Sequence, residues 1–282
     1  MKNFQLAAFA DEVDTSIDKQ IAAMKEEGIH FLEIRGVDGE NISDITLKKA
    51  GEIRKKMNDA GLDVWSLGSP FGKIGIEEEF MPHLDKFCHG LELAEVLGAK
   101  CIRLFSFFIP DGKPAADFRN AVMERLAMFV EKANGSGLIL CHENEKGIYG
   151  DIASRCLEIH QTVPELKAVF DPANFVQCGQ ETKEAWSMLS PYVEYMHIKD
   201  AKSDGFVVPA GEGVGNLPYL LSEYSGKILT LEPHLTVFEG LAGLEREGEK
   251  TEIDEFRYAD SRQAFAAAVS ALKKLIHLKN GA

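Results

Sequence analysis

Three acidic residues and one histidine each end a short apolar segment in the second half of the 282-residue chain. The segments read LILCHE, LKAVFD, VEYMHI and ILTLE, and the four polar residues are Glu143, Asp171, His197 and Glu232. The gaps between them are 28, 26 and 35 residues, and each is about the length of one strand plus one helix. Because the carboxyl ends of neighbouring barrel strands lie together, we expect the four side chains to meet at one point.

Carboxylate oxygens and an imidazole nitrogen suit hard and borderline divalent metals, so the set predicts one ion of Mn²⁺, Mg²⁺, Co²⁺ or Zn²⁺. Such an ion polarises a substrate carbonyl and makes the proton on the adjacent carbon acidic. Removing that proton and returning it from the other side requires two carboxylates within reach. We expect Glu143 and Glu232 to form this catalytic pair, because they end the predicted fifth and eighth strands and would flank a substrate.

Each of the four residues has an alternative interpretation when it is taken alone. Asp171 precedes Pro172 and fits the N-cap of a helix that begins at the proline. A single histidine in an apolar strand is usually a core residue, and a carboxylate at a strand end can instead form a salt bridge. The joint occurrence of all four at matching positions favours the metal site.

Further polar residues near the strand ends are candidate substrate contacts. Lys199 follows His197 by two residues, so strand periodicity places both on one side, where the lysine would hold an oxyanion or pair with a ligand carboxylate. Arg103 would bind a phosphate or carboxylate, or pair with Glu33. Lys73, in SPFGKIGI, would reach a phosphorylated sugar or remain on the surface. Five residues are expected to surround the ligands: Glu12, Glu33, His142, Glu145 and His234. His142 is also a candidate substrate contact.

Short apolar runs alternate with helical patterns along the whole chain, and no linker interrupts them. Eight strands are predicted near residues 4–10, 29–35, 62–68, 100–106, 137–143, 165–171, 193–199 and 227–232. A "helix, glycine, strand" junction recurs in EEGIHFLEI, DAGLDVWSL, LGAKCIRLF and GSGLILCHE. The pattern indicates an α/β chain that forms one (β/α)₈ TIM barrel over residues 1–282, with an open doubly wound sheet as the alternative. The glycine-rich AGEGVGN segment is predicted to be a flexible lid, and the acidic 239–255 region an excursion before a final helix.

The strings LCHENEKGIYGD, FDPANF, YMHIKDA, PAGEG and LTLEPH resemble those of the xylose-isomerase-like (AP-endonuclease-2-like) barrels of the sugar phosphate isomerase/epimerase type. The resemblance covers essentially the whole chain. It implies the same ligand set, Glu143, Asp171, His197 and Glu232, with the two glutamates as the acid/base pair. Asn174 and Ser203 stand where the ketose 3-epimerase branch has a histidine and an arginine that hold substrate hydroxyls, so Asn174 is a candidate substrate contact and free ketohexoses are doubtful substrates.

Composition narrows the function classes. Forty-five acidic and 31 basic residues give a net charge of −14, which disfavours nucleic acid and anionic membranes as partners. The five cysteines form no CxxC pair, and the sequence lacks a signal peptide and an apolar run of membrane-span length, so we expect a cytoplasmic protein, compatible with a homo-oligomer. The predicted function is a metal-dependent isomerase or epimerase of a small carbohydrate; the alternatives are a dehydratase or lyase, a sugar-binding barrel and an AP-endonuclease-like nuclease.

Overall fold

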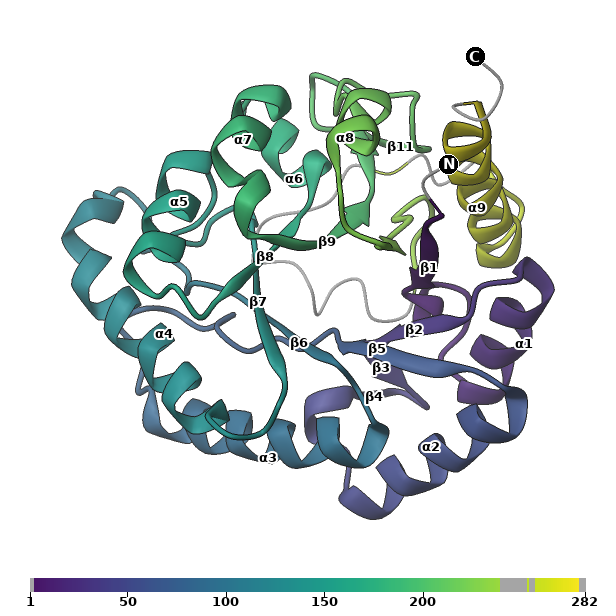
Figure 1. Cartoon of the computed structure of the whole chain (residues 1–282), viewed down its shortest axis with the longest axis horizontal. Coiled ribbons are helices and arrows are strands. Elements are labelled where there is room, and N and C mark those ends of the chain that lie inside the picture. Colours follow the sequence, from purple (N-terminus) through teal and green to yellow (C-terminus); the bar gives the residue numbers. More distant parts are fainter. Residues whose placement is uncertain (1–2, 239–252, 254–256, 279–282) are drawn as a thin grey trace.

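The chain forms a closed barrel of eight parallel strands with helices on its outside (Figure 1). The computed structural model describes residues 3–238, 253 and 257–278. Around the barrel the strand order is β1-β12-β9-β8-β7-β6-β5-β2, which excludes the open sheet. The strands are β1 (Gln5–Ala8), β2 (Phe31–Ile34), β5 (Asp63–Leu67), β6 (Cys101–Leu104), β7 (Ile139–Glu143), β8 (Lys167–Phe170), β9 (Val193–Ile198) and β12 (Ile228–Leu231). All eight lie within the predicted segments and confirm the barrel.

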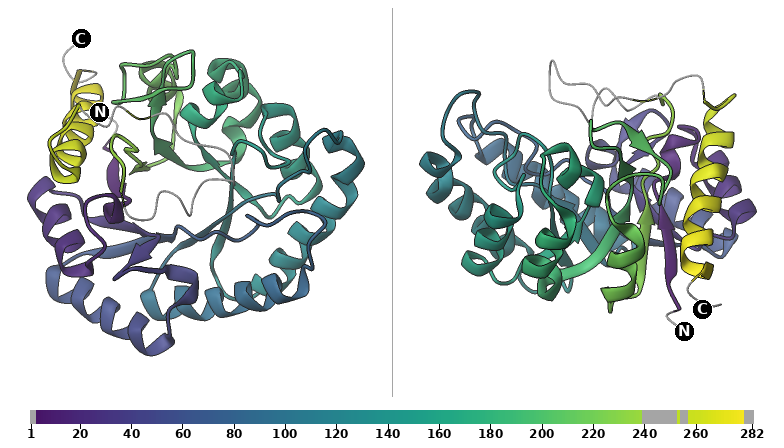
Figure 2. Two further views of the ribbon diagram at one scale, coloured as in Figure 1. Left: turned by 180° about the vertical axis from the view of Figure 1, so that it is seen from behind. Right: turned by 90° about the horizontal axis from the view of Figure 1, so that it is seen from above.

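The helices surround the strands, as the two views of Figure 2 show. They are α1 (Ile17–Glu27), α2 (Leu47–Ala60), α3 (Met81–Leu97), α4 (Arg119–Ala133), α5 (Ala153–Thr162), α6 (Pro172–Gln177), α7 (Thr182–Leu189), α8 (Leu217–Glu223) and α9 (Ser261–Leu278). Helix α9 confirms the predicted final helix and packs beside α1, where Lys273 Nζ donates to the carbonyl oxygen of Glu27 at 2.7 Å. No helix in this described part is long and apolar enough to cross a membrane.

Glycines end three of the outer helices and turn the chain back into the barrel. Gly28, Gly61 and Gly98 are the C-caps of α1, α2 and α3, and their φ angles are 65°, 70° and 70°. This left-handed conformation is inexpensive only for glycine, and it lets the cap amide bond the last carbonyls of the helix. The junction therefore fixes how β2, β5 and β6 begin after their helices, whereas α4, before β7, ends at Asn134 without a glycine cap.

Two small antiparallel ladders, which the sequence did not predict, extend from the barrel. One pairs β3 (Gly36–Val37) with β4 (Glu40–Asn41), and the other pairs β10 (Asp200–Ala201) with β11 (Val207–Val208). Both follow a strand that contributes to the site, namely β2 and β9. The predicted excursion at 239–255 lies outside the described residues, apart from residue 253.

The inside of the barrel is filled in two layers. Apolar side chains from every strand form the lower layer, which comprises Ala7, Phe31, Trp65, Cys101, Ile139, Cys141, Val169, Tyr195 and Ile228. Side chains that alternate with these along the strands face the helices instead, and Leu140, Met196 and Leu229 belong to that outer core. The polar layer lies above the apolar one, at the carboxyl ends of the strands.

Candidate functional site

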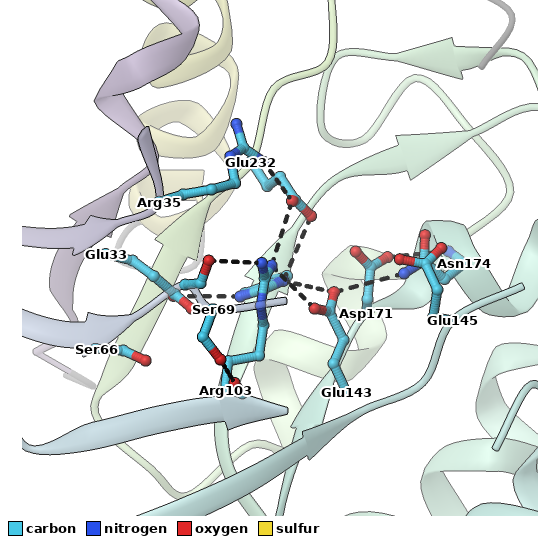
Figure 3. A network of polar contacts seen from close by, with 12 residues as sticks. Glu33, Arg35, Ser66, Ser69, Arg103, Glu143, Glu145, Asp171, Asn174 and Glu232 are labelled. Atoms are coloured by element: carbon cyan, nitrogen blue, oxygen red, sulfur yellow. Dashed lines mark hydrogen bonds and ion pairs between the residues drawn. The ribbon is translucent and has the colours of Figure 1, made fainter. Parts of the chain in front are cut away.

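The four predicted ligands meet at the carboxyl ends of four adjacent strands. Glu143 ends β7, Asp171 follows β8, His197 belongs to β9 and Glu232 follows β12. One donor atom from each residue lies within 4.8 Å of a donor atom from every other, and all four side chains are buried. Figure 3 shows Glu143, Asp171 and Glu232 extending toward a common centre.

The two ring nitrogens of His197 face different parts of the barrel. Nδ1 faces the ligand set, 2.8 Å from Glu143 Oε1 and 3.4 Å from Glu232 Oε2. Nε2 faces the opposite way and lies 3.2 Å from Glu33 Oε2. Burial alone would lower the pKa of His197, but the negative charges of Glu143, Glu33 and Glu232 outweigh it and raise that pKa well above its usual value.

Asp171 has two roles, because its two oxygens point to different partners. Oδ1 accepts a hydrogen bond from the backbone N–H of Asn174 at 3.0 Å and caps α6. This is the N-cap role that the sequence offered as the alternative for Asp171. Oδ2 lies 3.0 Å from Lys199 Nζ on the side of the ligand set. Asn144 holds the Asp171 backbone through two hydrogen bonds of 2.9 Å. Burial, opposed by the Lys199 charge, raises the pKa of Asp171 to about 7.

Buried cations lie against the two glutamates. Lys199 Nζ is 3.0 Å from Glu232 Oε2, and Arg35 Nη1 is 3.2 Å from Glu232 Oε1. Arg103 Nη1 is 3.1 Å from Glu143 Oε2. Burial favours the neutral acid in both glutamates, but neighbouring positive charge outweighs it: the pKa of Glu143 is lowered by His197 and Arg103, and that of Glu232 is lowered well below its usual value by Lys199, His234 and His197.

The donor set fits a divalent cation. Six carboxylates and three permanent cations make up the buried network in the described part of the chain; the acids are Asp11, Glu12, Glu33, Glu143, Asp171 and Glu232, and the cations Arg35, Arg103 and Lys199. Carboxylate oxygens and an imidazole nitrogen gathered at one buried point are ligands suited to such a cation. Glu143 Oε2 and Asp171 Oδ2 are buried and face cations but make no hydrogen bond, so each keeps lone pairs that a metal could use.

Comparison with known families agrees with this geometry. The family model described as "Xylose isomerase-like TIM barrel" matches residues 21–273. The chain belongs to this family. No curated protein sequence matches it.

Solved structures similar to this xylose isomerase-like barrel have diverse activities. A probable 3-DHS dehydratase, AsbF, from Bacillus anthracis is 16% identical with a TM-score of 0.72, over 96% of this chain and 98% of that one. The IOLI protein with a bound zinc atom is 14% identical with a TM-score of 0.74, over 97% and 98%. L-ribulose 3-epimerase is 16% identical with a TM-score of 0.71, over 99% and 97%. At these identities the likeness shows the fold alone.

Three of the five predicted substrate contacts lie at the centre of this xylose isomerase-like barrel. Lys199 and Arg103 face the ligand carboxylates, and Arg103 pairs with Glu143 instead of the predicted Glu33. Asn174 Nδ2 donates to the Asn144 carbonyl oxygen at 2.9 Å and lies 3.5 Å from Glu143 Oε1.

Lys73 and His142 lie farther out. Lys73 Nζ pairs with Glu145 Oε2 at 2.9 Å and stacks on the Phe105 ring. His142 points from β7 toward the helices, where Nε2 is 2.9 Å from Ser106 Oγ and its ring contacts that of His160. This orientation follows from strand alternation, since Glu143 next to it faces inward. The outward orientation of His142 does not support its predicted contact with a substrate.

Sequence reasoning overlooked the buried arginine that directly follows β2. Arg35 binds Asp11 through Nε and Nη2, at 2.8 and 3.0 Å, and lies over the Phe9 ring. One feature of the sequence pointed to it: Arg35 follows Glu33 by two residues, as Lys199 follows His197, so the arginine and the lysine both face inward. The barrel mouth therefore carries one more cation than the sequence analysis proposed.

The AGEGVGN segment is tied down, contrary to the predicted lid. The Asp200 carboxylate accepts from the backbone amides of Gly211, Gly213 and Gly215 at 2.9, 3.1 and 2.9 Å, and from Ala201 at 2.9 Å. The amides that would cradle a phosphate are thus used internally. The segment is a fixed wall beside β10.

Proposed function

We propose that this protein is a divalent-metal-dependent isomerase or epimerase of a small sugar, sugar phosphate or related hydroxy-keto compound. The observation that carries the proposal is the convergence of Glu143 and Glu232 on one buried centre together with Asp171 and His197. Two carboxylates at one cationic centre are what proton transfer next to a carbonyl requires. A protein that only binds a sugar has no need of such a pair.

The metal would be held by Glu143, Asp171, His197 and Glu232, in keeping with their oxygen and nitrogen donors. When bound, it supplies Lewis-acid polarisation of the substrate carbonyl. The ligand set suits Mn²⁺, Mg²⁺, Co²⁺ or Zn²⁺, and the cysteines lie elsewhere: Cys101 and Cys141 belong to the apolar layer beneath. Thiolate-preferring ions are therefore not the expected occupants.

Glu143 and Glu232 would move the proton. They extend from β7 and β12, between which β8 and β9 intervene, so they approach the centre from different sides. One carboxylate takes the proton from the carbon next to the carbonyl and leaves an enediolate. The other returns a proton, either to the opposite face of that carbon, which gives an epimer, or to the neighbouring carbon, which gives an isomer.

Lys199 and Arg103 would support the reaction by charge. Both are buried and directed at the ligand carboxylates, and their positive charge favours the ionised, proton-accepting forms of Glu143 and Glu232. The same positive charges stabilise an oxyanion that develops on the substrate in this water-poor centre. We assign them to substrate binding on this ground, with Asn174 as a neighbour of Glu143.

Two positions narrow the substrate class. Asn174 is buried, and Ser203 is exposed in the turn between β10 and β11. The family resemblance in the sequence implies a substrate-binding histidine and arginine at these positions in the ketose 3-epimerase branch, so we expect a compound other than a free ketohexose. Since all five cysteines are free thiols, we place the enzyme in a reducing cytoplasm, acting on a small carbohydrate.

A dehydratase is the second candidate. Loss of a hydroxyl group from the carbon beyond the enediolate uses the same first proton transfer, and a probable dehydratase is among the similar structures. In this case one glutamate would remove the proton and the other would protonate the departing hydroxyl. The two reactions diverge only after enolisation.

Proton exchange in D₂O tests the shared step before any product is known. Metal-loaded protein is incubated with ketoses, their phosphates and hydroxy-keto acids, and deuterium uptake next to the carbonyl is followed by NMR. We expect metal-dependent uptake from at least one compound, lost in Glu143→Gln and kept in the exposed control Glu165→Gln. Equal uptake by metal-stripped protein, or none across the panel by protein shown to hold metal, would contradict the proposal.

A further inference from the structure

A chain of buried hydrogen bonds lies directly beneath the ligand set and is not used by the proton transfer itself. Glu33 of β2 accepts from both of its neighbours: Oε2 lies 3.2 Å from His197 Nε2, and Oε1 receives the Tyr195 hydroxyl at 2.8 Å. Ser66 Oγ lies 3.3 Å from the Tyr195 oxygen. Because the phenolic proton goes to Glu33, only Ser66 can donate in that contact, and it shares its hydroxyl proton with the Leu67 carbonyl oxygen, which also lies 3.3 Å away. Figure 3 shows Glu33 and Ser66 on this side of the centre.

These residues are enclosed completely. Glu33, Ser66, Tyr195 and His197 are each 0% exposed, so no water competes for their hydrogen bonds. The Phe9 and Tyr195 rings contact the His197 ring edge-to-face at centroid distances of 5.3 and 5.5 Å. The two rings restrict the imidazole but do not determine which of its nitrogens faces the ligand carboxylates.

Glu33 favours one of the two orientations. The Glu33 carboxylate accepts a hydrogen bond from the ring nitrogen that faces it, and this nitrogen is Nε2. The other nitrogen, Nδ1, then faces Glu143 and Glu232, and once its proton is lost it is the nitrogen that would offer a lone pair to a metal at the centre. Carboxylates that accept from the far nitrogen of a histidine are known to fix ligand orientation and raise ligand basicity.

The backbone has two irregularities that bring the supporting residues inward. The pairing of β2 with β5 shifts between Leu32 and Glu33, so that Ser66 lies opposite Glu33. The pairing of β8 with β9 shifts between Ala168 and Val169 and places Tyr195 opposite Val169, in the inner layer. Bulges of this kind re-aim side chains near active sites. Both shifts supply a member of the same hydrogen-bond chain.

We propose that Glu33, held by Tyr195 and Ser66, is the positioning residue that orients His197 and presents Nδ1 to the metal. The inference rests on the metal site of the proposed function but not on the identity of the reaction. It assigns a role in metal affinity to three residues that make no contact with the ion or the substrate.

Metal titration tests the inference without any substrate. Co²⁺ binding is measured from its visible spectrum and by calorimetry for the wild type, Glu33→Gln and Tyr195→Phe. We expect the Co²⁺ dissociation constant of Glu33→Gln to rise about 10- to 100-fold, the usual effect of removing such a support. Tyr195→Phe, which keeps the ring and loses only the donor to Glu33, should show a smaller rise in the same direction.

Glu165→Gln is the matched control, because it makes the same chemical change at an exposed position outside this buried network. Its Co²⁺ dissociation constant should remain within about twofold of the wild-type value, well below the rise expected when a residue that orients a metal ligand is removed. In the Zn²⁺-loaded wild type, long-range ¹H–¹⁵N spectra should show His197 protonated at Nε2. In Glu33→Gln this tautomer signal should weaken or shift, an effect that a purely structural role would not produce.

The outcomes separate the two proposals. A wild type that binds no Co²⁺ would overturn the metal site of the proposed function. A wild type that binds Co²⁺ while Glu33→Gln and Tyr195→Phe bind it equally well would overturn the positioning role and leave the metal site intact. If Glu33→Gln fails to fold, Tyr195→Phe decides between these results.

Discussion

At the scale of single residues, Lys199 occupies the region where a divalent cation is expected to compensate charge. Its ammonium group lies 3.0 Å from both Asp171 Oδ2 and Glu232 Oε2, and the side chain is 5% exposed. Burial opposes the charged form of Lys199, but these carboxylates raise its pKa above the usual value. The lysine is therefore a permanent counter-charge of the metal-free protein.

We predict that Lys199→Met destabilises the metal-free protein by about 3 kcal/mol, because breaking a buried ion pair leaves carboxylates without compensation. Saturating Co²⁺ should restore most of this loss, and the Co²⁺ affinity should rise since a competing cation is absent. Urea unfolding in EDTA and in Co²⁺ measures both effects. The exposed pair of Lys55 with Asp59 supplies the control Lys55→Met, expected to change stability by less than about 1 kcal/mol. Equal destabilisation of Lys199→Met with and without metal would contradict this account.

At the scale of elements, the wall formed by residues 210–216 depends on one carboxylate. Asp200 begins β10 and accepts four backbone amides, three of them from glycines of this segment. Glycine is required where the chain approaches Asp200 closely: a Cβ on Gly213 would lie 2.3 Å from Asp200 Oδ1 and 2.4 Å from the Ala201 carbonyl oxygen. The close approach explains the glycines better than a need for flexibility.

We predict that Asp200→Asn loosens this segment, because the amide side chain offers one acceptor oxygen where the carboxylate offers two. The loss should be about 2 kcal/mol, in the range of lost hydrogen bonds to a charged group. Hydrogen exchange of the Gly211, Gly213 and Gly215 amides should accelerate by at least tenfold, while amides of β7 keep their protection. Asp204→Asn, in the neighbouring exposed turn, is the matched control, and unchanged exchange in Asp200→Asn would refute the predicted wall.

The elements were predictable from the sequence to a large extent, and physical reasons explain where prediction failed. Apolar runs such as ILCHE and AVFD mark strands that are buried on both faces, and the acids at their ends marked the site. Alternation along β9 correctly placed Lys199 beside His197. Applied to β7, the same rule opposes a substrate contact for His142, which shares the helix-facing side with Leu140.

Other features have no local signal in the chain. The register shifts that bring Ser66 and Tyr195 inward depend on how neighbouring strands pair, not on either strand alone. The same holds for the packing of AGEGVGN against Asp200, because a glycine-rich pattern is common to flexible segments and to close backbone approaches. Partners that are distant in sequence decide between such alternatives.

At the scale of the whole molecule, buried titratable groups make stability depend on pH in opposing ways. His142 and His160 are buried, and burial lowers their pKa values to about 3 and about 4. Burial instead raises the pKa values of Glu12 and Asp171 to about 8 and about 7. Acid therefore destabilises the fold through the histidines and stabilises it through the two acids, so the total pH dependence does not identify any one group.

A difference between variants isolates one histidine. The His160 ring stacks on Tyr192 and has a folded-state pKa of about 4, below its ordinary 6.5. Between these two pH values the unfolded chain binds a proton that the folded protein does not, so the stability contributed by the neutral ring is complete above about pH 6.5 and is lost toward pH 4.

Variants without this titration, His160→Gln and His160→Phe, should be less stable than the wild type at pH 7. Between pH 7 and pH 4.5 the difference in free energy of unfolding between wild type and each variant should shrink by about 2 kcal/mol, since one pKa unit corresponds to about 1.4 kcal/mol. The two substitutions change the packing by different amounts. The pH-dependent change in the stability difference should nevertheless be the same for both, because it arises from His160 of the wild type. Urea unfolding at pH 7, 5.5 and 4.5 measures it, and a pH-independent difference for both variants would show that His160 is not held neutral by its burial.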